Sequence, residues 1–502
     1  MDSPTAASTT LPPRPVVWWR ALLLIGLVGY AFFLIRHVGA LAGASDSSGY
    51  LNNARLLAAG QTATPQRIPP GIDAVQFDSF TFIPLGFRPM PDATMAPTYP
   101  IGLPLVLLAA AKIAGWELAP PLVMMVSALL AVALMFPLGR AAGLTPGWAA
   151  GGALLLATCP LTTFMSVQLM SDIPATTVAL VAIGCAWRSR TRQRWALAAG
   201  ACLALGGLIR PTNFMLILPI AVCLGLNGRR WLLLGLGGFP GVLVQLIYNS
   251  AAYGNPFASG YGDDLGSKFS FKIVPATLIH YARWLPVLLT PVGILALVLP
   301  WVGRRTRFAW VLVAWTVPFL AFYAGYWHTH EWWWYLRFLL PAFPAIIIGG
   351  LWVLRELWVR HLGPLMPSPL VARSCGIAAI IVILIHAAFW HHRLNAHLIG
   401  FGESIYSESS TWARENLPAD AIILTEQTSG ALTYYTDFSL VRWDSLNPEK
   451  FAQLTAVAGK RPLVAALFPH EVQPALAPRL PGRWQEIGAV RHVTFWQWSP
   501  EG

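Results

Sequence analysis

Two carboxylates stand at positions where a strongly apolar chain rarely carries charge. Asp46 follows a long apolar segment, within SDSSGYLNNARLLAAG, and Tyr50 lies four residues further along. Asp172 stands in MSDIPA, two residues before Pro174. Both precede apolar helical patterns, so we expect both at helix starts, where free amides and the helix dipole favour an ionised carboxylate. Each is interpreted either as a structural N-cap or as a group that takes part in chemistry.

Basic side chains are expected at the same membrane boundary. Arg210 and Pro211, in LIRPTNF, divide one long apolar stretch into two short helices. An arginine in so tight a hairpin needs an anionic partner, which a lipid headgroup, a substrate phosphate or one of the two carboxylates would supply. His330 and Arg337 lie in YWHTHEWWWYLRFLLPAFP, whose tryptophans and tyrosines are also typical of ordinary interfacial anchors.

Metal and disulfide chemistry find little support. His328 and His330 are followed by Glu331, but histidines two positions apart diverge on a helix and no third ligand is evident. A divalent metal would help a reaction at these residues, but the residues do not require one. No cofactor is therefore assigned. The cysteines all lie inside apolar runs, which argues against disulfides and zinc sites; they are Cys159, Cys185, Cys202, Cys223 and Cys375.

Composition indicates a membrane protein. The 502 residues are 56% hydrophobic and only 11% charged, and their mean hydropathy is +0.56. Such a chain can satisfy its backbone in lipid only as a helical bundle. The net charge of +12 would suit nucleic acid, but the arginines form short clusters between apolar runs, as the positive-inside rule expects. We therefore expect no nucleic-acid partner.

The amino-terminal part predicts one span and a long outer loop. Residues 1–15 are expected to form a disordered cytoplasmic tail, and the first span, from Val16 to Ile35, starts inside because of Arg14 and Arg20. Ala40-Leu41-Ala42 would also suit a signal-peptidase site, with the same orientation. The loop, residues 37–118, ends in an apolar segment, 98–115, that is short for a span and is predicted to lie half-buried on the outer side.

The remaining apolar runs predict an α-helical polytopic protein with about eleven transmembrane helices. The transmembrane domain covers residues 16–390, and this count places every short basic loop inside. From about residue 391 to 502, β-like runs alternate with helical ones, which predicts a small extracytoplasmic α/β domain. The spans after the first are 119–138, 147–166, 172–187, 195–209, 211–226, 231–250, 284–302, 308–326, 336–354 and 371–390.

Residues 16–350 resemble the membrane-embedded GT-C glycosyltransferases that take sugars from polyprenyl phosphates, in particular the bacterial relatives of protein O-mannosyltransferases and lipid A aminoarabinose transferases. The resemblance is carried by SDSSGYLNNARLLAAG, TYPIGLPLVLL, LMSDIPA, GLIRPTNF and YLRFLLPAFP, in this order and spacing.

The resemblance implies roles for individual residues. Asp46 matches the proposed catalytic base of the family, with Tyr50 as its nearby aromatic, and Asp172 matches the acid of the second outer loop. Arg210 and Arg337 match the phosphate-binding arginines. Many members carry an acidic pair at the first position, whereas Ser47 follows Asp46 here. We expect Asp46 in a mobile loop, where it would act in proton transfer.

Together these observations predict an inverting glycosyltransferase of the inner, cytoplasmic membrane, with its site on the outer face. The donor would be a polyprenyl-phosphate-linked sugar, and the acceptor an unknown glycan, lipid or protein; membrane lipids are further partners. Asp46 and Asp172 are the expected catalytic residues, and the substrate-binding residues are Tyr50, Arg210, Arg337 and His330. A lipid-linked sugar flippase, a polysaccharide polymerase and a non-catalytic sensor or assembly protein remain as alternatives.

Overall fold

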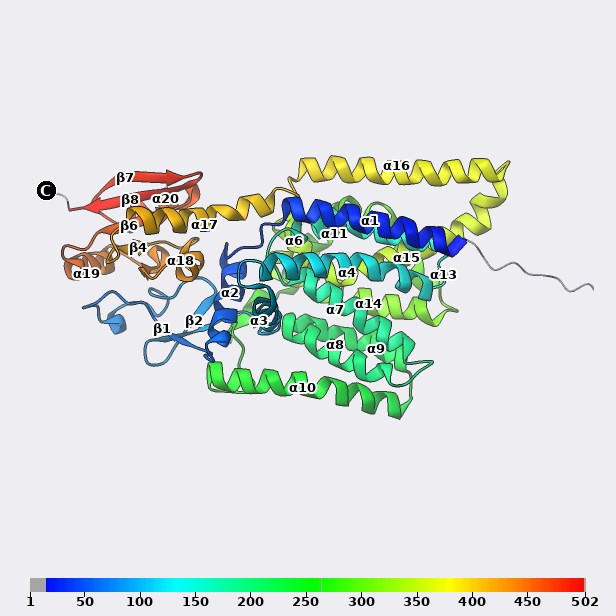
Figure 1. Ribbon diagram of the computed structural model, residues 1–502, viewed down its shortest axis with the longest axis horizontal. Coiled ribbons are helices and arrows are strands. Elements are labelled where there is room, and N and C mark those ends of the chain that lie inside the picture. The colour runs from blue at the N-terminus through cyan, green and yellow to red at the C-terminus, as the bar shows by residue number, and fades with distance from the viewer. Residues whose placement is uncertain (1–14, 263, 501–502) are drawn as a thin grey trace, which may run out of the picture.

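The computed structural model describes residues 15–262 and 264–500 as a helical bundle with an α/β unit at one end (Figure 1). The predicted tail 1–15 lies outside the described residues except for Pro15, which begins the first helix. The helices of the bundle are α1 (Pro15–His37), α4 (Ala119–Ala141), α5 (Pro146–Ala157), α6 (Pro160–Ser166), α7 (Asp172–Arg188), α8 (Trp195–Ile209), α9 (Ile217–Leu224), α10 (Gly228–Tyr253), α11 (Val274–Leu289), α12 (Val292–Leu295), α13 (Leu299–Val302), α14 (Arg307–Ala324), α15 (Phe343–Leu357) and α16 (Pro369–Arg393).

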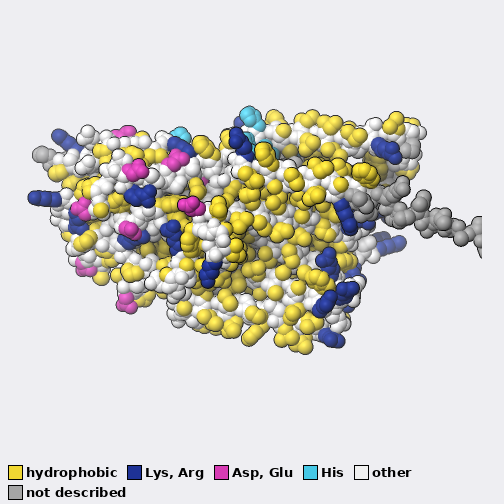
Figure 2. Space-filling model, viewed as in Figure 1, with side chains coloured by type: hydrophobic (Ala, Val, Ile, Leu, Met, Phe, Trp, Pro, Cys, Tyr) yellow, Lys and Arg dark blue, Asp and Glu magenta, His cyan; other side chains and the backbone are white. Residues whose placement is uncertain are grey.

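The bundle is that of a multi-pass membrane protein. Hydrophobic side chains cover its outer surface, whereas the acidic side chains visible in the same view lie towards the end that carries the α/β unit (Figure 2). Within the described residues, 6 helices are long and apolar enough to cross a membrane, or up to 8 if each of two bent pairs is one span. All predicted spans coincide with helical segments, but several of these segments are short. The count of about eleven therefore stays a prediction.

The two bent pairs have a common cause in proline. The segment formed by α5 and α6 bends by 58°, and the segment Phe271–Leu289 with Val292–Val302 bends by 118°. Pro160 begins α6, and Pro291 precedes α12 directly. Because proline has no backbone N–H and its ring clashes with the preceding turn, a helix cannot continue through it unchanged.

The segment between α1 and α4 forms a small layer over one end of the bundle. It contains α2 (Ser45–Ala58), β1 (Thr64–Pro65), β2 (Phe87–Met90), β3 (Thr94–Pro97) and α3 (Gly102–Ala114), and the strands pair antiparallel in the order β1-β3-β2. The short apolar helix expected near residues 98–115 is α3. Only one of its faces is buried, which includes Leu103 and Leu107.

The carboxyl-terminal part contains a five-stranded sheet flanked by helices. Strand β4 (Ile422–Leu424) pairs parallel with β5 (Ser439–Val441) and β6 (Leu463–Leu467), while β8 (Val493–Ser499) pairs antiparallel with β6 and with β7 (Arg483–Val490). The strand order is β5-β4-β6-β8-β7. The helices are α17 (Ile399–Asn416), α18 (Ser429–Tyr435), α19 (Pro448–Ala458) and α20 (Pro469–Leu476). The membrane side on which this part lies stays a prediction.

The α/β unit packs directly on α2. The side-chain amide of Asn52 donates a hydrogen bond to the Gly430 carbonyl at 3.0 Å. Nη1 of Arg55 donates to the Tyr434 carbonyl at 2.7 Å, so the guanidinium satisfies a free carbonyl at the end of α18. The helix that carries Asp46 is therefore held between the bundle and the α/β unit.

Candidate active site

Asp46 is the second residue of α2, and its carboxylate binds an arginine rather than the helix amides. Nη2 of Arg337 donates a hydrogen bond to Oδ2 of Asp46 at 2.8 Å. The N-cap residue of α2 is Ala44, which has no capping side chain. Asp46 thus lies at a helix start, as expected, but in an ordered helical turn that is tied to the bundle. The mobile loop expected around it is not what the structure shows.

A second ion pair adjoins the first. Asp172 is the first residue of α7, only 1% of its side chain is exposed, and its Oδ1 pairs with Nη1 of Arg210. Nη1 of Arg337 lies 4.0 Å from Oδ2 of Asp172. The four side chains therefore form one row of alternating charge, and each buried charge has an opposite charge beside it.

Proline determines where Arg210 stands. Helix α8 ends at Ile209, and a 3-10 helix, η2 (Pro211–Leu216), follows. Arg210 between them has φ −143° and ψ 114°. A residue before proline is disfavoured in the α region, so Arg210 adopts an extended conformation and leaves the helix. Arg337 comes from another 3-10 segment, η7 (Trp333–Ala342), directly before α15.

The site keeps Asp46 ionised. Burial opposes its charge, but the Arg337 guanidinium and the hydrogen bonds from Tyr99 and Arg337 outweigh burial, so the pKa of Asp46 lies below its usual range. A carboxylate must be ionised to accept a proton, and this condition is met at neutral pH. The same pairing weakens its basicity. An anionic ligand that took over Arg337 would raise the basicity of Asp46.

The row of charges borders a cavity of about 380 Å³ with largely aromatic walls. The ring of Phe338 lies under both arginines, 5.5 Å from the guanidinium carbon of Arg210 and 5.3 Å from that of Arg337. Aromatic rings contact the apolar faces of a sugar, phenol hydroxyls hydrogen-bond its hydroxyls, and guanidinium groups bind phosphate. The other aromatic wall residues are Tyr50, Tyr99, Tyr261, Phe269, Phe322, Tyr323, Tyr326 and Tyr335.

Hydroxyl pairs fix the orientation of several of these rings. The Tyr50 hydroxyl donates to Oγ of Ser171 at 3.0 Å, next to Asp172 in the chain. The hydroxyls of Ser45 and Tyr99 are 2.7 Å apart, and the Tyr323 hydroxyl donates to Oγ1 of Thr212 at 2.9 Å. These bonds join α2, the start of α7, η2 and α14, so the polar edge of the cavity is held by different parts of the chain.

The structure brings most of the expected site residues together. Those that line the cavity are Asp46, Tyr50, Arg210 and Arg337. Asp172 is behind Arg210, where it positions that side chain. His330 is not among the lining residues, whereas His328 is, and Nδ1 of His328 lies 3.0 Å from Oε2 of Glu331. Substrate binding by His330 stays a prediction that the geometry does not support.

Three residues near the cavity were not expected from the sequence. Tyr99 stands in the motif TYPIG, but the sequence predicts no role for it. Tyr261 and Glu403 belong to no recognisable pattern. Glu403, in α17, accepts a hydrogen bond from the Ala44 amide at 3.3 Å. Burial raises the pKa of Glu403 to about 7, against the effect of the Ala44 hydrogen bond. A second carboxylate therefore lies near the start of α2, but it comes from a distant part of the chain. The residue that follows Asp46 in the sequence is Ser47, which has no carboxylate.

The donor set does not suit a divalent cation. Both Asp46 and Asp172 are engaged by guanidinium groups. Within residues 15–262 and 264–500, no group of three His, Cys, Asp or Glu side chains could hold a metal ion. The positive charge available to an anionic ligand in this cavity comes from Arg210 and Arg337.

Comparisons with known proteins identify the fold. No protein-family model and no curated protein matches the chain. The solved structure of ArnT from Cupriavidus metallidurans bound to undecaprenyl phosphate is 15% identical, with a TM-score of 0.55, and the match covers 96% of this chain and 98% of that one. The Archaeoglobus fulgidus oligosaccharyltransferase is 12% identical, with a TM-score of 0.51 over 90% of this chain and 70% of that one.

A third similar structure extends the group. The arabinofuranosyltransferase AftD from Mycobacteria is 12% identical, with a TM-score of 0.52, and the match covers 96% of this chain but 40% of the longer AftD chain. At such identities the likeness concerns the fold and not the reaction. All three are glycosyltransferases of the GT-C type, and the chain has the GT-C fold.

Proposed function

We propose that this protein is an inverting glycosyltransferase that moves a sugar from a polyprenyl phosphate to an acceptor hydroxyl at the outer face of the cytoplasmic membrane. The observation that carries the proposal is the pairing of Asp46 with Arg337 beside Arg210, at the edge of an aromatic cavity in a GT-C fold. The undecaprenyl phosphate bound to the similar ArnT structure supports a lipid-phosphate donor.

The arginines would bind the donor phosphate and stabilise its departure. When the bond between C1 of the sugar and the phosphate oxygen breaks, negative charge grows on the polyprenyl phosphate. Guanidinium groups at Arg210 and Arg337 interact more strongly with that charge in the transition state than in the ground state, which lowers the barrier. The leaving group then needs no proton.

Asp46 would act as the base for the acceptor. The acceptor oxygen attacks C1 on the face opposite the phosphate, and Oδ2 or Oδ1 of Asp46 takes the hydroxyl proton. A single displacement of this kind inverts the configuration at C1. Donor phosphate competes with Asp46 for Arg337, so donor binding would release the carboxylate for proton transfer.

Asn substitution of the two carboxylates tests the proposal. Asp46→Asn should slow single-turnover transfer by about 100-fold or more without weakening donor binding, because a base acts mainly in the transition state and the asparagine competes less with the donor phosphate for Arg337. Asp172→Asn should also weaken donor binding, because it leaves Arg210 without its partner. Purified protein in nanodiscs, with donor binding and transfer measured separately, distinguishes the two effects. Normal transfer by Asp46→Asn would remove the base from this mechanism, whereas absence of transfer by the parent protein would favour a flippase.

A further inference from the structure

A second group of arginines lies at the end of the bundle away from α2. Basic side chains gather at this end, where the chain passes from α7 to α8, from α9 to α10 and from α13 to α14 (Figure 2). Two cavities open here. The first, of about 460 Å³, is lined by Trp187, Arg188, Arg190, Thr191, Arg230 and Arg307. The second, of about 670 Å³, shares Arg307 with it.

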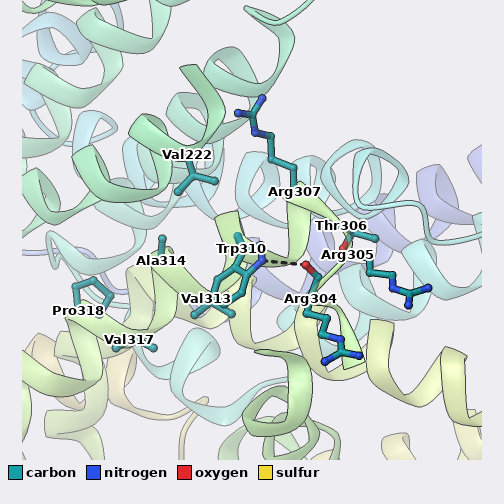
Figure 3. Close-up of a pocket in the computed structure, with 10 residues that line it drawn as sticks. All are labelled: Val222, Arg304, Arg305, Thr306, Arg307, Trp310, Val313, Ala314, Val317 and Pro318. Carbon is teal, nitrogen blue, oxygen red and sulfur yellow. Dashed lines mark hydrogen bonds between the residues drawn. The ribbon is translucent and has the colours of Figure 1, made fainter. Parts of the chain in front are cut away.

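The second cavity combines charge with an apolar wall. Arg304, Arg305 and Arg307 surround the start of α14, while Val222 of α9 and the side chains of Ala314, Val317 and Pro318 along α14 lie to one side (Figure 3). Trp310 stands between the two groups, and its ring N–H donates to the Arg304 carbonyl at 3.2 Å. Exposed fractions of 45% for Trp310 and 53% for Val317 show that this wall continues to the lipid-facing surface.

The arginines of the first cavity are positioned but not neutralised. Nη1 of Arg230 donates to the Leu224 carbonyl at 3.1 Å and Nη2 to the Arg190 carbonyl at 3.2 Å, while its Nε is buried without a hydrogen-bond partner in the described structure. The Arg190 guanidinium lies 4.3 Å from the Trp187 ring. In the described part of the chain, none of the cavity's arginines forms an ion pair.

Other arginines at the same end show that acidic partners are available elsewhere. Arg355 and Arg360 pair with Glu356 at 2.8 and 3.1 Å. Several guanidinium groups close together without a carboxylate attract an external anion, and arginine matches phosphate oxygens well. A soluble phosphate would need no apolar wall. A phospholipid presents both a phosphate and acyl chains, and basic pockets between membrane helices bind such headgroups.

We propose that the two cavities joined at Arg307 form one binding site for an anionic phospholipid of the adjacent leaflet. Its phosphate lies among Arg190, Arg230 and Arg307, and an acyl chain follows the apolar wall between α9 and α14. Bound there, the lipid bridges these two helices. Thr212, in η2 directly before α9, and Tyr323, near the far end of α14, are hydrogen-bonded to each other. The lipid site does not depend on the proposed transfer reaction.

Lipid binding to the purified full-length protein tests the proposal. Phosphatidylglycerol, but not phosphatidylcholine with the same acyl chains, should remain bound in native mass spectrometry and raise the melting temperature, since a ligand that binds only the folded state stabilises it. Arg230→Gln with Arg307→Gln should weaken this binding by about tenfold or more, because charge-assisted hydrogen bonds are lost. Equal retention of both lipids would overturn the proposal of a site for an anionic phospholipid.

A matched variant controls for the loss of charge. Arg360→Gln with Arg373→Gln removes the same charge at the same end of the bundle, away from both cavities, and should leave phosphatidylglycerol binding unchanged. Equal weakening by both double variants would mean general surface attraction and would overturn the proposal.

The apolar wall distinguishes a lipid from a soluble anion. Ala314→Trp fills the groove and keeps every arginine, so it should weaken phosphatidylglycerol binding as the double arginine variant does. If the double arginine variant fails to fold, Ala314→Trp still tests the lipid site. Inorganic phosphate at millimolar concentration should not displace the lipid. Full displacement by phosphate, together with unchanged binding by Ala314→Trp, would assign the cavity to a soluble anion instead.

Discussion

The charged side chains of the cavity neutralise one another. Asp46 and Asp172 each hold one arginine, and Arg337 lies between the two carboxylates. This arrangement makes two largely buried guanidinium groups tolerable, because unpaired buried charges are costly. In the proposed reaction, the arginines would already hold fixed positions when a phosphate binds, so little reorganisation would be needed.

Substitution of the arginines should separate charge from geometry. Lysine keeps the positive charge but lacks the two-pronged guanidinium group, so Arg210→Lys and Arg337→Lys should retain part of the transfer activity. Alanine removes the charge and leaves a carboxylate unpaired, and we expect a loss of about 100-fold or more in donor affinity or rate. Donor binding and transfer assays measure both. Near-normal activity of the two alanine variants would indicate that these arginines bind lipid headgroups and not the donor phosphate.

Glu403 should add a pH dependence of its own. Its pKa rises from 4.5 to about 7 in the folded protein, chiefly through burial. The folded state therefore binds this proton more tightly than the unfolded state. Its contribution to stability is greatest below about pH 4.5 and falls as the pH rises towards 7, by at most about 3 kcal/mol.

Glu403→Gln should remove that fall. Melting temperatures of the parent protein and of the variant, measured from pH 5 to 8, should converge or cross as the pH rises, with the parent protein losing more. Glu408 lies in the same helix and pairs with Arg491 away from the cavity, so Glu408→Gln serves as the control. Parallel pH profiles for the parent protein and Glu403→Gln would show that this carboxylate does not titrate as described.

The ends of helices, rather than their middles, build the site. Asp46 and Asp172 stand in the first turns of α2 and α7, and Arg210 follows the last residue of α8. Such positions depend on how each helix is held. The close packing of α3 against the end of α8 is one such constraint, because a Cβ on Gly102 would lie 2.4 Å from the carbonyl carbon of Leu208.

Gly102→Ala should therefore displace the end of α8 and, with it, Arg210. Overpacking against backbone costs about 1–3 kcal/mol, and we expect weaker donor binding as well as a lower melting temperature. Gly184 in α7 is a matched control, because nothing lies within 4 Å of a Cβ added there. Gly184→Ala should be close to neutral. Unchanged donor affinity in Gly102→Ala would mean that α3 does not hold Arg210 in place.

Across the whole molecule, the charge distribution separates the two ends. Basic side chains gather at one end of the bundle, and α2 and the α/β unit lie at the other (Figures 1 and 2). Asp46 and Tyr50 of α2 line the cavity. From the positive-inside rule we predict that the arginine-rich end faces the cytoplasm. The candidate site would then face the outer compartment, together with the α/β unit that Asn52 and Arg55 of α2 bind.

Reporter fusions test this orientation. A fusion after Arg192 should report the cytoplasm, and fusions after residues 60 and 400 should report the outer compartment. The expected pattern follows from the basic residues between α7 and α8 and from an odd number of spans before residue 400. A cytoplasmic signal at 400 would contradict both the span count and the proposed position of the α/β unit.

The amino-acid sequence alone determines the class of the protein and the positions of its main helices. Apolar runs between clusters of arginine predict the helices because backbone groups in lipid must be satisfied within each segment. Helix starts at Asp46 and Asp172 and the break at Arg210 and Pro211 also follow from local rules, and the structure shows each of them. These features depend only on neighbouring residues.

Tertiary structure alone decides which of these side chains meet. The pairs Asp46–Arg337 and Asp172–Arg210 join residues far apart in the chain, and no local pattern distinguishes His328 at the cavity from His330 outside it. Glu403 is the clearest case, because it reaches Ala44 only through the packing of α17 against the start of α2. Long-range contacts of this kind arise from packing shape and the pairing of buried charge, which a one-dimensional pattern of residues does not encode.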